Sequence, residues 1–446
     1  VAALLFWPIA ARLAVLLERG YTRALRREKT FHAGRAFAFM LACYVPMFCV
    51  AFPGSFAYDV PYQLRQVVTG AYSTHHPLLH TLALGGLLQL GRALGDINLG
   101  AALYTALQMA LLAGCFALTC GSIARQSGAR AAKRAAVFFA LYPLNMVMAV
   151  NATKDVLFGG FFALTLALLN EIQEKPSRGL ALKIATCGAL AVMLRNNMAY
   201  AALVWLALLT IGLRKGEKSA ALAMLLALAV GLCGNAALKH ATRAESGDMS
   251  EMLSWPIQQL ARARLYDEER LTDAEKEAID ELMPGEAWAC YDPTISDPVK
   301  FEFDTQAFRA DVKKYVGVWL SVGKKCAGTY LDATMALTYP FFYPYREYRV
   351  SGYYVQMGMS DAYDAGWCDF DPPESRSPFP RALASLSWRF GAKGAMQIPV
   401  VGWLFNMGVI VWTMLFFALR EMYWGRWRRF GTALLPVVLW GTVLLG

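Results

Sequence analysis

The sequence is poor in charge: only 17% of its 446 residues are charged, whereas 57% are hydrophobic and the mean hydropathy is +0.36. Strand-like alternation is scarce, and neither an internal repeat nor a low-complexity tract is present. We also expect no cleavable signal peptide in this stretch, because the first apolar run ends in a basic cluster instead of a small-residue cleavage site. What remains is the pattern of an all-α polytopic membrane protein.

The nine cysteines form no disulfide framework. Six lie within or beside apolar runs, where cysteine usually behaves as a small hydrophobic residue. Cys290, Cys326 and Cys368 lie elsewhere, so at most one disulfide can form among these three. No Cys-x-x-Cys pair of the metal-binding kind occurs, and we expect no cofactor.

Ten apolar runs have lengths suited to crossing a bilayer, and they predict about ten membrane spans. The runs lie at residues 1–17, 34–52, 98–122, 135–150, 155–171, 181–194, 198–213, 219–236, 396–419 and 431–446. This pattern predicts a transmembrane core over 1–236, an extracytoplasmic region over 237–395 and C-terminal transmembrane helices over 396–446.

The net charge of +10 reflects topology rather than nucleic-acid binding. Residues 237–395 contain 24 acidic and 18 basic residues, net −6, so the rest of the chain carries the positive excess. Most of these cations lie in five short connectors, at 19–29, 125–134, 175–183, 214–218 and 420–429. The positive-inside rule makes these connectors cytoplasmic and places 53–97, 151–154, 195–197 and 237–395 outside. We therefore expect a multi-pass protein of the cell membrane, in contact with membrane lipids.

The two long outer segments are predicted to be mainly helical. In 53–97, a short helix begins at Pro61, and the apolar stretch after Pro77 is interpreted as a helix in the outer membrane interface. In 237–395, Thr272 and Glu275 have the spacing of a capping box, and residues 305–323 have the spacing of an amphipathic helix.

Two cations outside the membrane are placed to line an outward-facing cavity. Lys154 begins one predicted span, and Arg195 ends a short one. An ionisable group at membrane depth is costly and usually lines a cavity, where lysine and arginine suit phosphate oxygens. We interpret Lys154 and Asp155 as facing an anionic lipid carrier. Alternatively, Lys154 snorkels and pairs with Asp155, while Arg195 caps a helix C-terminus.

Asp59 is the first acid of the outer segment 53–97, next to Tyr58 and one helical turn before Gln63. A carboxylate just above the membrane, near cationic phosphate binders, is what a general base for activating a hydroxyl requires. A helix N-cap is the alternative, since Tyr-Asp-Val-Pro suits that role. The pattern alone does not separate the two.

His75, His76 and His80 raise the question of a metal. His76 and His80 have the i,i+4 spacing of ligands on one helix face, but no glutamate lies between them and Pro77 follows directly. We therefore expect no metal here, and a hydrogen-bonded turn or contacts to an acceptor or phosphate are the other interpretations.

Amide and basic side chains elsewhere complete the candidates. Asn196 and Asn197 follow Arg195, where they bind sugar hydroxyls or phosphate, or else satisfy a broken helix end. Gln259 and Arg262 share a helical segment, in which Arg262 either reaches a phosphate or faces solvent.

Several motifs, in this order, resemble the GT-C superfamily of membrane glycosyltransferases. An outer-loop aspartate is followed by HHPLLHTLALGGLLQLGRALG, which is similar to the His-Pro stretch and interfacial helix of those enzymes. A closer resemblance, over roughly residues 45–440, is to a bacterial GT-C-like family of poorly defined function. It is carried by FPGSFAYDVPYQ, HHPLLHT, TKDVLFGG, LRNNMAY, PIQQLARA and YDPTISDPVK.

The resemblance implies a GT-C-like bundle and a metal-independent glycosyltransferase. Such an enzyme moves a hexosyl or pentosyl group, with inversion, from a polyprenyl-phosphate donor to a hydroxyl of an envelope glycan or lipid on the outer face. It implies that Asp59 is the general base and that Lys154 and Arg195 hold the carrier phosphate, to which we add Arg262. The expected substrate-binding side chains are Tyr58, Gln63, His75, His76, Asp155, Asn196, Asn197 and Gln259.

Three other classes fit parts of the sequence. A surface-polysaccharide polymerase or ligase shares the large outer loop and a lipid-linked substrate, but relies on arginines such as Arg262, Arg346 or Arg349. A lipid-linked-sugar transporter is expected to show repeated halves and broken helices at mid-membrane, whereas the polar residues here gather at one face. A scaffold without chemistry is the third.

Overall fold

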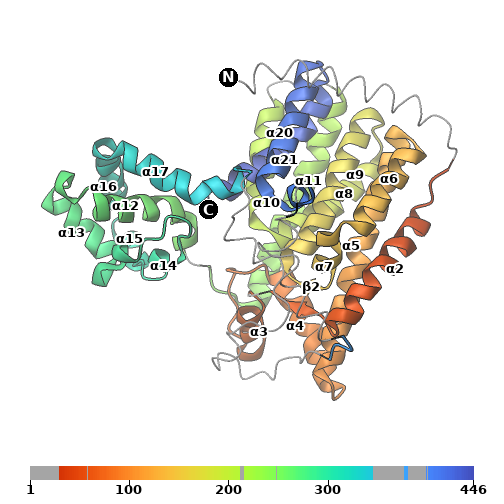
Figure 1. Cartoon of the computed structure of the whole chain (residues 1–446), viewed down its shortest axis with the longest axis horizontal. Helices are drawn as coiled ribbons and strands as arrows, with labels where there is room; N and C mark the ends of the chain where they lie inside the picture. The colour runs from red at the N-terminus through yellow and green to blue at the C-terminus, as the bar shows by residue number, and fades with distance from the viewer. Residues whose placement is uncertain are drawn as a thin grey trace. The chain divides into compact units, whose positions relative to one another are not determined.

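The computed structural model describes residues 30–57, 59–210, 215–247, 249–344, 376–379, 398 and 400–445 (Figure 1). It is about 82% helical, in agreement with the predicted all-α class. The chain divides into two compact units. The first runs to Glu245 and includes Met414–Val438, and the second begins at Ser246 and includes Asn406–Thr413. The apolar run at 1–17 lies outside the described residues.

The first unit consists mainly of helices, some of them long and apolar. In chain order they are α2 (Ala33–Ala51), α3 (Val60–Thr69), α4 (Leu78–Ala93), α5 (Ile97–Ser127), α6 (Ala129–Leu141), α7 (Pro143–Ala149), α8 (Lys154–Glu174), α9 (Arg178–Leu194), α10 (Asn196–Thr210) and α11 (Lys215–Thr242). Among the described helices, α2, α5, α8 and the Glu217–Thr242 part of α11 are long and apolar enough to cross a membrane. Their length and hydropathy indicate a membrane protein.

The helices of this bundle pack through small residues and through polar contacts. α8 lies against α5 and α9, and α9 lies against α11 (Figure 1). Gly188 of α9 permits the last approach, because a Cβ atom there would lie 2.8 Å from that of Ala227 on α11. At the far end of α5, Arg125 donates to both carboxylate oxygens of Glu171 on α8, at 2.5 and 2.8 Å.

The apolar run at 135–150, expected to be one span, is divided between two helices. α6 ends at Leu141, Tyr142 is extended (φ −66°, ψ 115°), and Pro143 is the first residue of α7. A residue before proline is driven out of the helical region, and proline itself favours the first position of a helix. The helix is therefore interrupted within this apolar run, where Tyr142 precedes Pro143.

Two very short strands join distant parts of the first unit. β1 (Ser55–Phe56) and β2 (Asn151–Ala152) pair in parallel, with Ser55 opposite Asn151. Gln108 of α5 holds the second strand, because its Nε2 donates to the carbonyls of Ala149 and Asn151 at 3.0 and 2.8 Å. α3, α4 and β2 lie together at one end of the bundle, the lower end in Figure 1.

The second unit is mainly helical, as the sequence predicts for this region. Its helices up to Thr338 are α12 (Ser254–Tyr266), α13 (Asp273–Leu282), α14 (Asp297–Lys300), α15 (Thr305–Ala310), α16 (Val312–Lys325) and α17 (Ala327–Thr338), with short 3₁₀ turns between them. Its core contains Ile257, Ala261, Ile279 and Val322, all nearly or fully buried. Near the C-terminus lie α20 (Met407–Tyr423) and α21 (Trp427–Leu445), most of whose residues belong to the first unit.

Local signals set the helix ends of the second unit. The predicted capping box is confirmed, because Thr272 Oγ1 accepts from the Glu275 backbone N–H while the Glu275 carboxylate accepts from that of Thr272. The single amphipathic helix expected over 305–323 is two helices instead. They separate at Asp311, whose carboxylate accepts from the Lys314 backbone N–H at 2.9 Å and so starts a new helix.

Candidate functional site

The clearest polar cluster in the first unit begins where the two parallel strands end. Asp59 follows β1 by three residues and Lys154 follows β2 by two, so strand pairing brings both to one edge. Lys154 Nζ donates to Asp59 Oδ2, and the two side chains are only 19% and 18% exposed. Asp59 occupies the N-cap position of α3 but makes no side-chain cap bond, so its carboxylate does not serve the N-cap role that Tyr-Asp-Val-Pro suggested.

A second ion pair lies at the next residue of α8. Arg195, the C-cap residue of α9, donates from Nη1 to Asp155 Oδ1, and its guanidinium lies 6.0 Å from the centre of the Phe158 ring. Lys154 and Asp155 are therefore paired with other elements of the fold, not with each other. Asn196 and Asn197 follow Arg195 directly as the first residues of α10.

Two of the predicted histidines adjoin the first pair. His76 Nδ1 lies 3.9 Å from Asp59 Oδ2, and its side chain is 6% exposed. His75 packs edge-on against His76, with ring centres 4.6 Å apart, and the Tyr62 ring lies 6.3 Å from that of His76. The structure thus brings together Asp59, Lys154, His75 and His76, four of the candidates.

Burial and charge oppose each other at Asp59. Burial raises the pKa of its carboxyl, but the Lys154 ammonium and its hydrogen bond lower that pKa by more, so it lies below its ordinary value of 3.8. Burial lowers the pKa of His76 to about 4, although Asp59 opposes that shift. At neutral pH the cluster therefore contains an ionised carboxylate and a neutral imidazole beside Lys154.

A series of buried hydrogen bonds connects the elements that carry this cluster. His80 Nδ1 lies 3.0 Å from Gln63 Oε1, and His80 Nε2 lies 2.8 Å from the Tyr104 hydroxyl. Tyr104 in turn lies 3.1 Å from Gln108 Oε1, and Gln108 holds β2. This hydrogen-bond chain joins α3, α4 and α5 to the strand that precedes Lys154, and all four side chains are at most 2% exposed.

The direction of these hydrogen bonds follows from Gln108. Its Nε2 is committed to backbone carbonyls, so its Oε1 must accept the single hydroxyl hydrogen of Tyr104. Tyr104 then accepts from His80, which carries its proton on Nε2. His80 Nδ1 therefore needs a donor, and turning over the Gln63 amide supplies one, because Gln63 Nε2 has no partner among the described residues. Burial lowers the pKa of His80 to about 3, which keeps the ring neutral.

Tyr104 and Gln108 did not emerge from the sequence as site residues. Both lie within the apolar run at 98–122, four residues apart, which places them on one face of a helix. Polar side chains inside a predicted span usually face the protein interior or a cavity. This signal was present in the sequence and points to the same end of the bundle as Asp59.

The remaining candidates lie in the second unit or beyond the described residues. Gln259 donates to Thr334 Oγ1 and accepts from the Trp319 indole, each at 2.8 Å. Arg262 donates to the Tyr291 hydroxyl at 3.2 Å and lies 3.6 Å from the carboxylate of Asp332. Both side chains thus have partners within that unit. Tyr58 lies outside the described residues.

A metal site is not apparent in the part of the chain that the structure describes. No group of three or more His, Cys, Asp or Glu side chains in those residues is arranged to hold an ion. His76 and His80, the pair with ligand-like spacing, are instead engaged with Asp59 and with the Gln63–Tyr104 chain.

Comparison with known proteins gives one match. The model of a family described as a family of unknown function (DUF6020) matches residues 66–446. The chain belongs to this family. The match includes His75, His76, Lys154 and Arg195, and it begins seven residues after Asp59. No curated protein and no solved structure matches the chain.

Proposed function

We propose that this protein is a membrane glycosyltransferase that moves a sugar from a polyprenyl-phosphate donor to a hydroxyl of an envelope glycan or lipid. The observation that supports this proposal most directly is the cluster of Asp59, Lys154 and His76 at one end of an apolar bundle. It combines a carboxylate suited to general-base catalysis with a cation suited to a phosphate leaving group.

In the proposed reaction the carboxylate of Asp59 and the cation of Lys154 have different roles. The acceptor hydroxyl loses its proton to Asp59 as its oxygen attacks the anomeric carbon from the face opposite the phosphate, so the configuration inverts. The bond from that carbon to the phosphate oxygen breaks, and the leaving phosphate takes the electron pair. Lys154, with Arg195 nearby on the next ion pair, stabilises the anion that departs.

Because Lys154 is paired with Asp59 before the sugar donor binds, binding of the donor phosphate should change the pKa of Asp59. Lys154 holds the pKa of Asp59 below its ordinary value, and a weakly basic carboxylate is a poor general base at neutral pH. A donor phosphate that attracts Lys154 weakens this hold and adds negative charge nearby. Both effects raise the pKa of Asp59, so the base becomes stronger when the donor is in place.

The proposed topology has about ten spans, with this cluster on the extracytoplasmic side. It rests on the cations of the connectors at 125–134, 175–183 and 420–429, which the positive-inside rule makes cytoplasmic. α8 runs from Lys154 to Glu174, and 21 helical residues extend about 30 Å, close to the thickness of the hydrocarbon core. Asp59 then lies at the opposite membrane face from these connectors.

The experiment that tests this function uses the purified full chain with a panel of polyprenyl-phosphate sugars and cell-envelope acceptors. Release of polyprenyl phosphate together with labelled acceptor supports the proposal. Growth of an existing glycan by many units points to the polymerase or ligase class, and flipping of the donor across vesicles without cleavage points to a transporter. Either of these results, with no single-sugar transfer, would contradict the proposal.

A further inference from the structure

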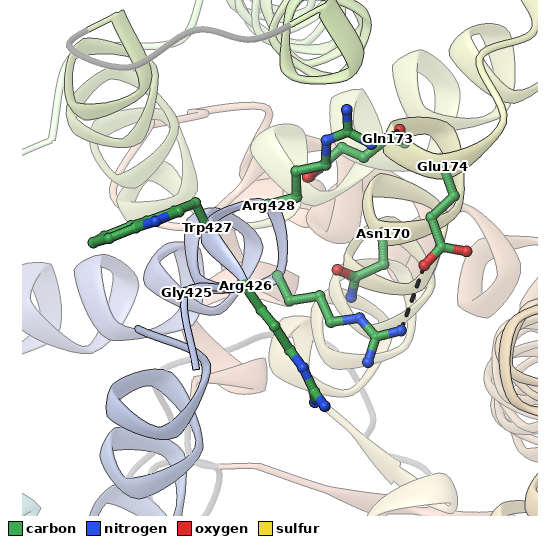
Figure 2. A pocket seen from close by; sticks show the side chains of 8 residues that line it. Asn170, Gln173, Glu174, Gly425, Arg426, Trp427 and Arg428 are labelled. Atoms are coloured by element: carbon green, nitrogen blue, oxygen red, sulfur yellow. Dashed lines mark hydrogen bonds and ion pairs between the residues drawn. The ribbon is translucent and has the colours of Figure 1, made fainter. Parts of the chain in front are cut away.

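A second polar site lies at the other end of α8, about 30 Å from Lys154 by the length of that helix. It is a cavity of about 270 Å³ between the end of α8 and the start of α21, shown in Figure 2. Its lining consists of Asn170, Gln173, Glu174, Gly425, Arg426, Trp427, Arg428 and Arg429. None of these residues belongs to the Asp59 cluster.

The lining carries more positive than negative charge. It contains three arginines and a single carboxylate, that of Glu174. Arg429 lies 3.5 Å from this carboxylate, and Arg428 donates to the Gln173 carbonyl at a long 3.4 Å. A guanidinium has five N–H donors, so these long contacts leave both side chains able to bind an anion. The backbone N–H groups at the start of α21 add a further preference for negative charge.

Gln173 has a buried acceptor atom, and an anion without an N–H or O–H group cannot donate a hydrogen bond to it. The residue is 4% exposed, and its Nε2 donates to Thr432 Oγ1 at 2.7 Å. Its Oε1 is buried and has no partner among the described residues. A buried acceptor left unpaired is unfavourable, so this site favours a ligand that also brings an N–H or O–H donor.

We propose that this cavity binds a phosphate ester that carries a hydroxyl or ammonium donor close to the phosphate. Arg428 and Arg429 hold the phosphate, and Gln173 Oε1 accepts from the donor group. Trp427, which is 49% exposed beside them, is the type of residue that settles at a membrane interface. The head group of a glycerophospholipid and a soluble glycerol phosphate share this chemistry. The site is separate from glycosyl transfer and does not depend on it.

The test compares lipids that share the phosphate and differ in the head group; phosphatidylethanolamine and phosphatidylcholine are both zwitterionic and form the matched pair for the donor. Delipidated full chain in detergent is mixed with phosphatidylglycerol, phosphatidylethanolamine or phosphatidylcholine, and bound lipid is quantified by native mass spectrometry. Phosphatidylcholine has the phosphate but no head-group N–H or O–H. We expect phosphatidylethanolamine to bind about tenfold more tightly than phosphatidylcholine, because its ammonium makes a charge-assisted hydrogen bond. Phosphatidylglycerol should also bind more tightly than phosphatidylcholine, through its hydroxyl donors and its net negative charge. Competition with glycerol phosphate distinguishes the soluble source, since it displaces lipid only if the free ester is bound as well.

Variants assign the effect to the cavity. The double variant Arg428→Gln/Arg429→Gln should weaken binding of all three lipids about tenfold to a hundredfold, as expected for lost charge-assisted contacts. Arg178→Gln removes an exposed arginine of a neighbouring connector outside the cavity and should leave binding unchanged. Asp59→Asn should also leave it unchanged. Unaltered lipid binding in a folded Arg428→Gln/Arg429→Gln protein overturns the proposal.

The acceptor has its own matched pair of variants. Gln173→Leu removes Oε1 and the bond to Thr432, whereas Thr432→Val removes only that bond. We expect Gln173→Leu to lose the preference for phosphatidylethanolamine over phosphatidylcholine and Thr432→Val to keep it. If both variants keep the preference, or if both lose it, the role given to Gln173 is wrong.

Discussion

Lys154 and Asp59 form an ion pair although 95 residues separate them in the sequence. The parallel pairing of β1 with β2 makes this contact, because each strand ends within three residues of one partner. The pair lies at the start of α8, a helix long enough to cross a membrane, and most of its surface is shielded from water. An ion pair so placed is unlike an exposed surface pair, which contributes little to stability.

Removing the Lys154 ammonium should reverse the way in which the contribution of Asp59 to folding stability changes with pH. In the wild type the pKa of Asp59 lies below 3.8, so its stabilising effect is present above that pH and is lost as the pH falls through the folded value. In Lys154→Met the two effects of the ammonium are gone, and burial, which raises this pKa, is opposed only by the neighbouring His76 and His75. Asp59 then destabilises the variant increasingly as the pH rises above 3.8. The measurement is the difference in Tm between the two proteins from pH 4 to pH 8, and a difference that does not grow with pH would contradict this account.

Loss of either cation should weaken donor binding. Lys154→Ala and Arg195→Ala each remove a charge-assisted contact, worth about 1.5–3 kcal/mol of binding free energy. Each also leaves a carboxylate unpaired, so the Asp155→Asn/Arg195→Gln variant is needed as a control, because it removes the second ion pair without leaving an unpaired charge. Donor affinity is measured by titration with a fluorescent polyprenyl-phosphate sugar. Wild-type affinity in both alanine variants would show that these cations do not hold the phosphate.

The buried hydrogen-bond chain should be visible in His80. We expect ¹⁵N NMR of histidine-labelled protein, assigned with His80→Gln, to show a neutral ring protonated on Nε2 from pH 5 to pH 8. Burial lowers the pKa of His80 from 6.5 to about 3. Between pH 6.5 and about pH 3 the unfolded chain therefore binds a proton on this ring that the folded protein does not bind. Stability should therefore fall as the pH falls through this interval. Titration of His80 near pH 6.5, or an Nδ1–H ring, would be inconsistent with the chain.

Tyr104→Phe tests the same chain through stability. It removes the hydroxyl that joins His80 to Gln108 and leaves two buried polar atoms unpaired, at a cost of about 1–3 kcal/mol in the free energy of unfolding. Tyr200→Phe is the control, because Tyr200 is 50% exposed. Denaturant unfolding of the two variants in detergent gives the comparison, and equal stabilities would exclude a structural role for the Tyr104 hydroxyl.

Topology can be tested with single cysteines in a chain whose native cysteines are replaced. Ser127→Cys lies at the exposed end of α5, in the connector predicted to be cytoplasmic, and Thr69→Cys lies at the exposed end of α3. A membrane-impermeant maleimide added to intact cells should label Thr69→Cys and not Ser127→Cys. The reverse pattern would place the Asp59 cluster on the cytoplasmic side.

Hydropathy predicted the helices well and the contacts poorly, for a physical reason. The run at 34–52 became α2, that at 155–171 became α8, and the interfacial helix expected after Pro77 became α4. Each of these helices is predicted from a long run of mostly apolar residues, so the signal is summed over many positions. β1 and β2 have two residues each, too few for any period to appear, yet their pairing decides which charge meets Lys154.

Local alternatives were likewise settled by distant residues. Asp155 was one of two expected partners for Lys154, but in the structure Arg195, 40 residues away, takes Asp155 and Asp59 takes Lys154. Adjacent residues at the start of a helix point in different directions, so each meets a different neighbour. Lys154 and Arg195 were identifiable because cations beside apolar runs are rare on the side that the positive-inside rule makes external. Their pairing was not, because it depends on how the runs pack.

The measurement that bears most directly on the central claim is single-turnover sugar transfer by Asp59→Asn, paired with its affinity for the donor. The substitution keeps the shape and the contact to Lys154 but removes the basicity, and loss of a general base typically lowers the rate by about 10²–10⁴-fold. We expect donor binding to be retained, transfer to be nearly abolished, and Asp155→Asn to stay active. Near-normal transfer by Asp59→Asn would contradict the account, and an inactive Asp155→Asn beside it would assign the base to Asp155.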